Sequence, residues 1–293
     1  MSDKSLYSTK VDIYNQDGDL ETSTSNATVL GGRIALETIF KGGFTPGQHL
    51  TLDKILSTVK GANIENPSAT VQPNQTSSRD TAVAADYHNR TIKYFCIGTG
   101  GIVTESPLAM AEPRPYETGL YKVVPFRCVP TGSDLTSEER LKYRMRRKEV
   151  INGHSYYTYY LKKFEPGSLN LLKSDGTPYT PAVGDSVEVT PSTEDDHPLR
   201  NTSIHSFYEF SMYIDAVDFK EYYKAINNDS LDNAKLTEIG LVLAEDLPVM
   251  VTSTDGATYN EVRNVELFSK VVHSPSYMDQ EENGKQISYT IYS

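Results

Sequence analysis

The sequence contains no tryptophan, two cysteines and no long apolar run. Tryptophan is the usual large aromatic platform for sugars, so its absence argues against a carbohydrate-binding protein. Cys96 and Cys128 are too few for a disulfide framework or a zinc site, and we expect two buried thiols in a reducing compartment. No segment approaches the roughly 20 apolar residues of a membrane span, and residues 1–5 lack the apolar core of a secretory signal. We therefore expect a soluble protein that is made in a cytoplasm.

Positive charge is also scarce. The chain has 28 Lys and Arg against 39 Asp and Glu, which gives a formal net charge of -11. Such a chain repels a polyanion at long range, whereas a protein whose main work is to grip DNA usually has the opposite sign. The 20 tyrosines and 9 phenylalanines instead suit β-strands and wet protein–protein surfaces.

The N-terminal part of the chain is polar. Residues 1–25 are rich in Ser, Thr, Asn and Asp, and we expect an extended polar arm that contains at most one short strand, over residues 11–14. Residues 26–293 then form one mainly-β domain with a long polar loop over residues 62–89. Two short helices are predicted, over residues 33–41 and 52–59.

From residue 90 onward, short β-rich segments alternate with turn signals. Strands are predicted over residues 91–97, 121–128 (interrupted by Pro125), 204–214, 236–244, 262–273 and 286–292, and a short helix over residues 219–226. Many short strands separated by turns are typical of a β-sandwich or a related barrel. The expected fold is therefore mainly β, with a β-sandwich-like core, a few short helices and long polar loops.

The clearest hairpin is predicted over residues 141–164. The dipeptide Asn152-Gly153 is the preferred sequence of a two-residue type I′ turn, and β-rich sequence flanks it on both sides. This turn would place Ile151 opposite His154 and so fix the register of the whole hairpin.

One face of this hairpin is predicted to be basic. Five residues alternate along its first strand and would share that face: Arg140, Lys142, Arg144, Arg146 and Lys148. The register sets Tyr159 opposite Arg146 and Tyr157 opposite Lys148, so we expect a basic, tyrosine-studded surface. Three interpretations stay open: a solvated outer face, a surface that meets an acidic neighbouring subunit, or a surface that meets a nucleic-acid backbone. The net charge of -11 favours a protein neighbour over DNA.

Local motifs for chemistry are weak. The loop Gly98-Thr-Gly100-Gly101 follows a strand, but it lacks the third glycine, the helix and the Lys-Ser/Thr pair of phosphate-binding loops. Residues 15–19 begin like a calcium loop without its central glycine or closing Glu. The six histidines are scattered, and the acidic residues before His197 resemble a solvated loop. We therefore expect no catalytic site, no cofactor and no metal.

The C-terminal third carries a family resemblance. The runs over residues 236–244, 264–272 and 287–292, together with the hairpin that ends in Tyr-Tyr-Leu-Lys-Lys, resemble virion structural proteins of large contractile-tailed bacteriophages. The most similar group is the neck or head–tail connector group, whose members form rings between the portal and the tail. The resemblance implies a homo-oligomeric ring, contacts with other virion proteins, and non-specific contact with DNA that passes through the lumen.

The expected function is therefore that of a non-catalytic structural protein of a phage virion, made in the host cytoplasm, without contact to a membrane. Contacts with copies of itself and with other virion proteins would use the N-terminal arm, residues 62–89 and exposed strand edges. The alternatives are another virion location (capsid decoration or baseplate), a carbohydrate-binding or hydrolytic β-sandwich, and a nucleic-acid binder.

Overall fold

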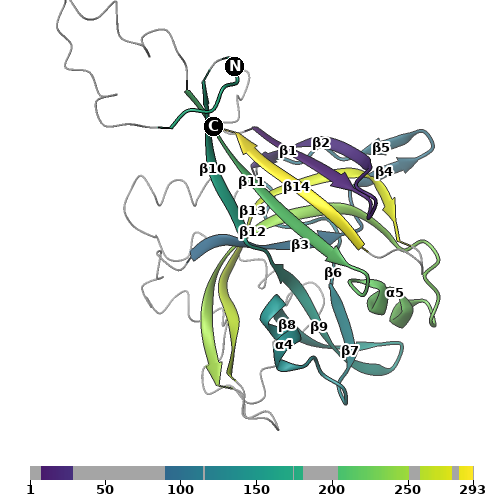
Figure 1. Cartoon of the computed structure of the whole chain (residues 1–293). Helices are drawn as coiled ribbons and strands as arrows, with labels where there is room; N and C mark the ends of the chain where they lie inside the picture. Colours follow the sequence, from purple (N-terminus) through teal and green to yellow (C-terminus); the bar gives the residue numbers. More distant parts are fainter. Residues whose placement is uncertain are drawn as a thin grey trace, which may run out of the picture.

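A computed structural model describes residues 8–28, 90–114, 116–173, 175–180, 204–250, 258–278 and 284–292 (Figure 1). The strands are β1 (Ser8–Tyr14), β2 (Leu20–Thr28), β3 (Arg90–Gly98), β4 (Ile102–Glu105), β5 (Leu108–Met110), β6 (Val123–Val124), β7 (Arg127–Pro130), β8 (Tyr143–Ile151), β9 (His154–Lys163), β10 (Pro166–Lys173), β11 (Ile204–Asp215), β12 (Lys235–Met250), β13 (Thr258–Tyr277) and β14 (Gly284–Tyr292). The helices in these ranges are α4 (Ser137–Lys142) and α5 (Lys220–Ile226). The prediction of a mainly-β fold is confirmed.

The strands pair antiparallel along one continuous path, in the order β10-β11-β14-β1-β2-β13-β12-β3-β9-β7. Strand β6 joins β3, strand β8 joins β9, and β4 and β5 form a separate two-stranded sheet. The path folds into two layers, and β2 and β13 connect them through only two residue pairs. Buried side chains of both layers share the main core, where Ser269 of β13 and Tyr289 of β14 join their hydroxyl groups in a hydrogen bond of 2.6 Å.

The layer that contains β3 and β12 is buried on both faces. Since alternate residues of a strand point to opposite faces, Phe95 and Ile97 enter the main core while Tyr94 and Cys96 enter a second core on the other side. The β8–β9 hairpin contributes Met145 to this second core, together with Tyr160 and Leu161. A continuous apolar run such as β3 therefore reflects two packed faces.

The prediction of a polar arm over residues 1–25 is wrong for residues 8–25, although the short strand predicted over residues 11–14 is confirmed as part of β1. Strand β1 lies between β14 and β2 and pairs with both. Its side chains Val11 and Ile13 are fully buried in the main core. Two alternating apolar residues are enough to bury one face of a strand, and the polar residues between them lower the average hydrophobicity without preventing pairing.

The β8–β9 hairpin confirms the predicted register, including the pair Ile151–His154. Asn152 and Gly153 have φ values of 49° and 81°, as a type I′ turn requires. The predicted first strand begins too early, however, because residues 137–142 form helix α4. Thr136 caps this helix, and Glu139 completes a reciprocal capping box with it.

The remaining predicted elements are mostly confirmed. Pro125 separates β6 from β7, so the expected strand over residues 121–128 is two short strands. The predicted C-terminal strands correspond to β11, β12, β13 and β14, and the predicted short helix is α5. The predicted helices over residues 33–41 and 52–59, and the loop over residues 62–89, lie outside the described residues.

Candidate functional site

Two of the five residues of the predicted basic face, Arg140 and Arg146, converge on one partly buried carboxylate. Asp134, in the loop between β7 and α4, accepts hydrogen bonds from Arg140 and from Arg146, whose Nη2 lies 2.7 Å away. The Tyr159 hydroxyl donates to the other oxygen of Asp134 at 2.6 Å. The Arg146 guanidinium stacks 3.5 Å from the ring centroid of Tyr157. Burial acts to lower the pKa of Arg146, but the charge of Asp134, the hydrogen bond to it and the neighbouring Tyr159 and Tyr157 together outweigh burial and raise that pKa.

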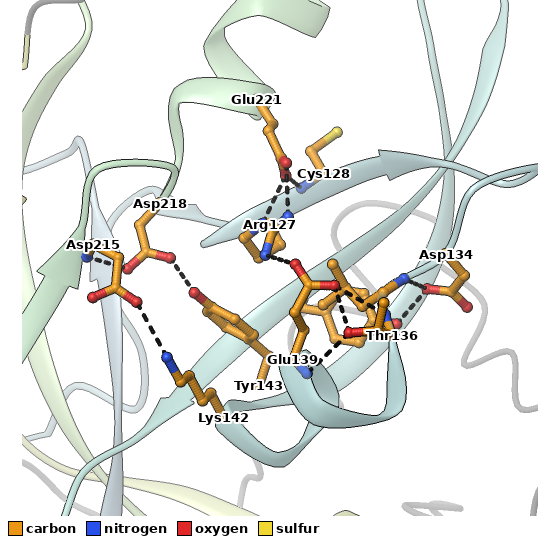
Figure 2. A network of polar contacts seen from close by, with 12 residues as sticks. Arg127, Cys128, Asp134, Thr136, Glu139, Lys142, Tyr143, Asp215, Asp218 and Glu221 are labelled. Carbon is orange, nitrogen blue, oxygen red and sulfur yellow. Dashed lines mark hydrogen bonds and ion pairs between the residues drawn. The ribbon is translucent and has the colours of Figure 1, made fainter. Parts of the chain in front are cut away.

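A second centre joins both helices to β7 through Arg127. Its Nη2 and Nε donate to the two carboxylate oxygens of Glu221 in α5, at 2.9 and 3.0 Å, and its Nη1 donates to Glu139 of α4 at 3.0 Å (Figure 2). Glu221 also accepts the backbone N–H of Cys128 at 2.9 Å. Two-pronged contacts of this kind are stronger and more directional than a single ion pair. This centre therefore fixes α4 and α5 on the same strand.

A third centre surrounds Asp218, in the turn between β11 and α5. Its carboxylate accepts from the Tyr143 hydroxyl at 2.7 Å, from Lys162 Nζ at 2.5 Å and from the backbone N–H of Asp215 at 2.7 Å. Lys162 Nζ also lies 3.0 Å from Asp215 Oδ2. Figure 2 shows Asp218 facing Tyr143, beside the exposed pair of Asp215 and Lys142. Burial raises the pKa of Asp218, against the opposing effect of the Lys162 charge.

The predicted basic surface is therefore wrong for most of its residues. Arg140, Arg144 and Arg146 are buried, and Tyr159 lies in the main core. Arg144 donates to backbone carbonyl groups in and next to α4. Lys142 and Lys148 are exposed as predicted, and Tyr157 is half-buried.

Sequence reasoning missed the acidic residues because they come from outside the paired strands. A cross-strand register predicts only the neighbours within one hairpin, whereas Asp134 and Asp218 lie in turns and Glu221 lies in α5. One local signal was present: the spacing of Thr136 and Glu139 is that of a capping box, which predicts a helix start.

The two cysteines are free and buried, as predicted. Burial, followed by the charges of Glu221 and Glu149, raises the pKa of Cys128 to about 12. Burial also raises the pKa of Cys96. Both thiols are therefore protonated near neutral pH, where a thiol is a poor nucleophile.

Two negative findings apply to the part of the chain that the structure describes. No cluster of three His, Cys, Asp or Glu side chains is arranged to hold a metal ion there. No helix in those ranges is long and apolar enough to cross a membrane.

The β4–β5 hairpin carries a different kind of surface. It lies at the periphery of the molecule, outside the main sheet path (Figure 1). Val103, Leu108 and Met110 are 67%, 46% and 41% exposed on it. Lys235 Nζ forms an ion pair with Glu105 Oε1 at 2.7 Å, and this contact connects the hairpin to the start of β12.

The fold and the three carboxylate centres define a mainly-β protein whose interior is braced by ion pairs. A family model described as "Family of unknown function (DUF7208)" matches residues 75–291, and the chain belongs to this family. No curated protein and no solved structure matches the chain.

Proposed function

We propose that this protein is a non-catalytic structural part of a larger assembly, in which it binds copies of itself and other proteins. The observation that carries the proposal is the exposed apolar β4–β5 hairpin. Large apolar patches are rare on monomeric proteins and usually mark a contact with another protein, and this short hairpin exposes Val103, Leu108 and Met110 together. Met and aromatic residues are enriched at these contacts, and Tyr116 and Tyr121 are exposed in the segment that follows the hairpin.

The use of the basic side chains supports a protein partner over a nucleic acid. The guanidinium groups that could have formed a basic stripe are directed to Asp134 and to backbone carbonyl groups. They are therefore not available for phosphate contacts, which dominate affinity for DNA. With a formal net charge of -11, the chain is better suited to protein contacts.

The resemblance to contractile-phage virion proteins suggests where such an assembly would stand. We propose the neck of a phage virion, where the chain would form a ring after its synthesis in the host cytoplasm. Capsid decoration and the baseplate are the alternative positions within a virion. Mass spectrometry of purified particles of a phage that encodes this chain should detect it in a fixed copy number. Particles that lack the chain would refute the virion assignment.

The assembly proposal is tested by the mass of the purified protein in solution. We expect light scattering at two concentrations to give a ring-sized oligomer, or a mass that grows with concentration. The double change Val103→Ser with Met110→Ser should reduce that mass to a monomer, because it removes the apolar contact. Val150→Ser is the matched control, since Val150 is 69% exposed on another hairpin. A wild-type monomer at both concentrations, or equal masses for all variants, would contradict self-assembly through this hairpin.

A further inference from the structure

We propose that Lys162 and Asp218 react with each other to form an intramolecular isopeptide bond, with Asp215 as the group that transfers the proton. The bond would join β9 to the turn between β11 and α5. The proposal is independent of the assembly function, because it concerns a reaction within one chain.

The reacting groups are held in contact. Lys162 Nζ lies 2.5 Å from Asp218 Oδ2, and their side chains are 5% and 0% exposed. The carboxyl group cannot rotate freely, because Tyr143 holds Oδ1 and the backbone N–H of Asp215 holds Oδ2. Groups fixed in this way react as if their concentration were very high, since the entropy of bringing them together is already lost on folding.

Burial favours the neutral form of the Asp218 carboxyl group. An amine attacks a carboxyl group only when the amine is neutral, and the carboxyl group accepts it best when it is neutral too. Taking a carboxylate out of water is costly, so the fully buried position of Asp218 favours its protonated form. The raised pKa of Asp218 is consistent with this effect. The proposed reaction begins when one proton passes along the hydrogen bond from Lys162 Nζ to Asp218 Oδ2.

The reaction balances without an oxidant or any other reactant. The Lys162 nitrogen forms a bond to Asp218 Cγ, and the negative charge that develops on Oδ1 is stabilised by the Tyr143 hydroxyl. Asp215 Oδ2 lies 3.0 Å from the Lys162 nitrogen and takes a proton from that nitrogen. Asp215 then donates this proton to Asp218 Oδ2. The bond from Cγ to Oδ2 breaks, one water molecule leaves, and a neutral amide remains.

The surroundings provide a path for that water. Lys162 and Asp215 line a surface pocket of about 610 Å³, together with Lys142 and Tyr213. Asp215 is 43% exposed at this pocket, whereas Asp218 behind it is fully buried. The proton-transfer group therefore meets solvent while the reacting carboxyl group does not.

Two other buried lysines, Lys270 and Lys285, lack this combination. Lys270 pairs with Glu117 at 2.7 Å, and Lys285 pairs with Glu21 at 2.7 Å. Both of those carboxylates are partly exposed, at 15% and 30%. The Lys162 centre combines a fully buried acceptor with a second carboxylate beside the amine, which is the pair of acids that the proton transfer requires.

The experiment is the intact mass of the purified full-length chain under denaturing conditions. We expect a mass lower than the sequence mass by one water molecule, and a branched peptide that links Lys162 to Asp218 after digestion. Lys162→Arg keeps the positive charge but should restore the full mass. Asp215→Asn keeps both reacting groups and should slow the loss of water. Lys163→Arg is the matched control, because Lys163 is the adjacent lysine and pairs with Glu165 near the surface; it should keep the deficit.

Two results would overturn the proposal. One is a wild-type chain that retains its full sequence mass after prolonged incubation in the folded state, with folding verified by circular dichroism. The other is a deficit that persists in Lys162→Arg, because the water would then be lost elsewhere, for example in a succinimide at an Asp-Gly sequence. The wild-type measurement requires no substitution, so a variant that fails to fold does not obscure the answer.

Discussion

Removing the Asp134 carboxylate tests whether Arg140 and Arg146 stabilise the folded protein through their ion pairs with it. In Asp134→Ala, Arg140 and Arg146 lose the carboxylate that they share, and Tyr159 loses its acceptor. Breaking a buried ion pair by removing one partner costs about 3–5 kcal/mol. Asp134 is 19% exposed, so water replaces part of the lost contact, and three contacts to one group do not add. We therefore expect a loss of about 3 kcal/mol in the free energy of unfolding.

Equilibrium unfolding in urea measures this loss, provided that the slope m is the same for both proteins. Asp134→Asn separates charge from shape, because the amide keeps the size of the side chain and one acceptor oxygen. We expect it to lie between the wild type and Asp134→Ala. The control is Glu138→Ala, an exposed acidic residue in the adjacent helix, for which a change within about 0.5 kcal/mol is expected.

The outcome that refutes this reasoning is a small effect. If Asp134→Ala were as stable as Glu138→Ala, the arginines would not depend on the carboxylate. Other contacts, such as the stacking of Arg146 on Tyr157, would then have to account for their burial.

Two further predictions concern other buried ionisable groups. Burial lowers the pKa of His273 from 6.5 to about 4. Between these pH values the His273 imidazole is protonated in the unfolded chain but neutral in the folded protein. Stability should therefore fall by up to about 3 kcal/mol as the pH decreases from about 6.5 to about 4. His273→Gln should flatten this slope in urea titrations, whereas exposed His154→Gln should not. Buried Glu238 accepts three backbone N–H groups between residues 100 and 122. Glu238→Gln should cost about 2–4 kcal/mol and speed hydrogen exchange of those amides, unlike exposed Glu112→Gln; unchanged exchange would mean that the carboxylate does not hold the segment.

Sequence patterns were sufficient for the elements that depend on local chemistry. Asn152-Gly153 predicts a turn with two positive φ angles, and this turn fixes the register of β8 and β9. Pro125 cannot donate a backbone hydrogen bond, so it interrupts a strand wherever the strand lies. These features require no knowledge of the rest of the fold.

Which face of a strand meets solvent and which meets the protein interior could not be predicted in the same way. Alternation places Arg144 and Arg146 on one side of β8, but it does not say whether that side meets water or protein. The answer depends on Asp134 and Asp246, which approach from other segments. The same limit explains β1, since its burial depends on β14, more than 270 positions further along the chain.

The Asp218 centre raises the question of why a fully buried carboxylate is retained. As an ion pair, Lys162 and Asp218 carry a desolvation cost that apolar residues of similar volume would avoid. As an amide, they carry no charge, and the cost disappears. The link would also close a loop between positions 56 residues apart, which by chain entropy alone stabilises the folded state by about 4 kcal/mol. Because β9 belongs to one layer and the turn after β11 to the other, that stabilisation would act between the layers. Where β2 and β13 pair, the hydrogen-bonded connection is only two residue pairs long, so a covalent link elsewhere would resist separation of the layers at a second point.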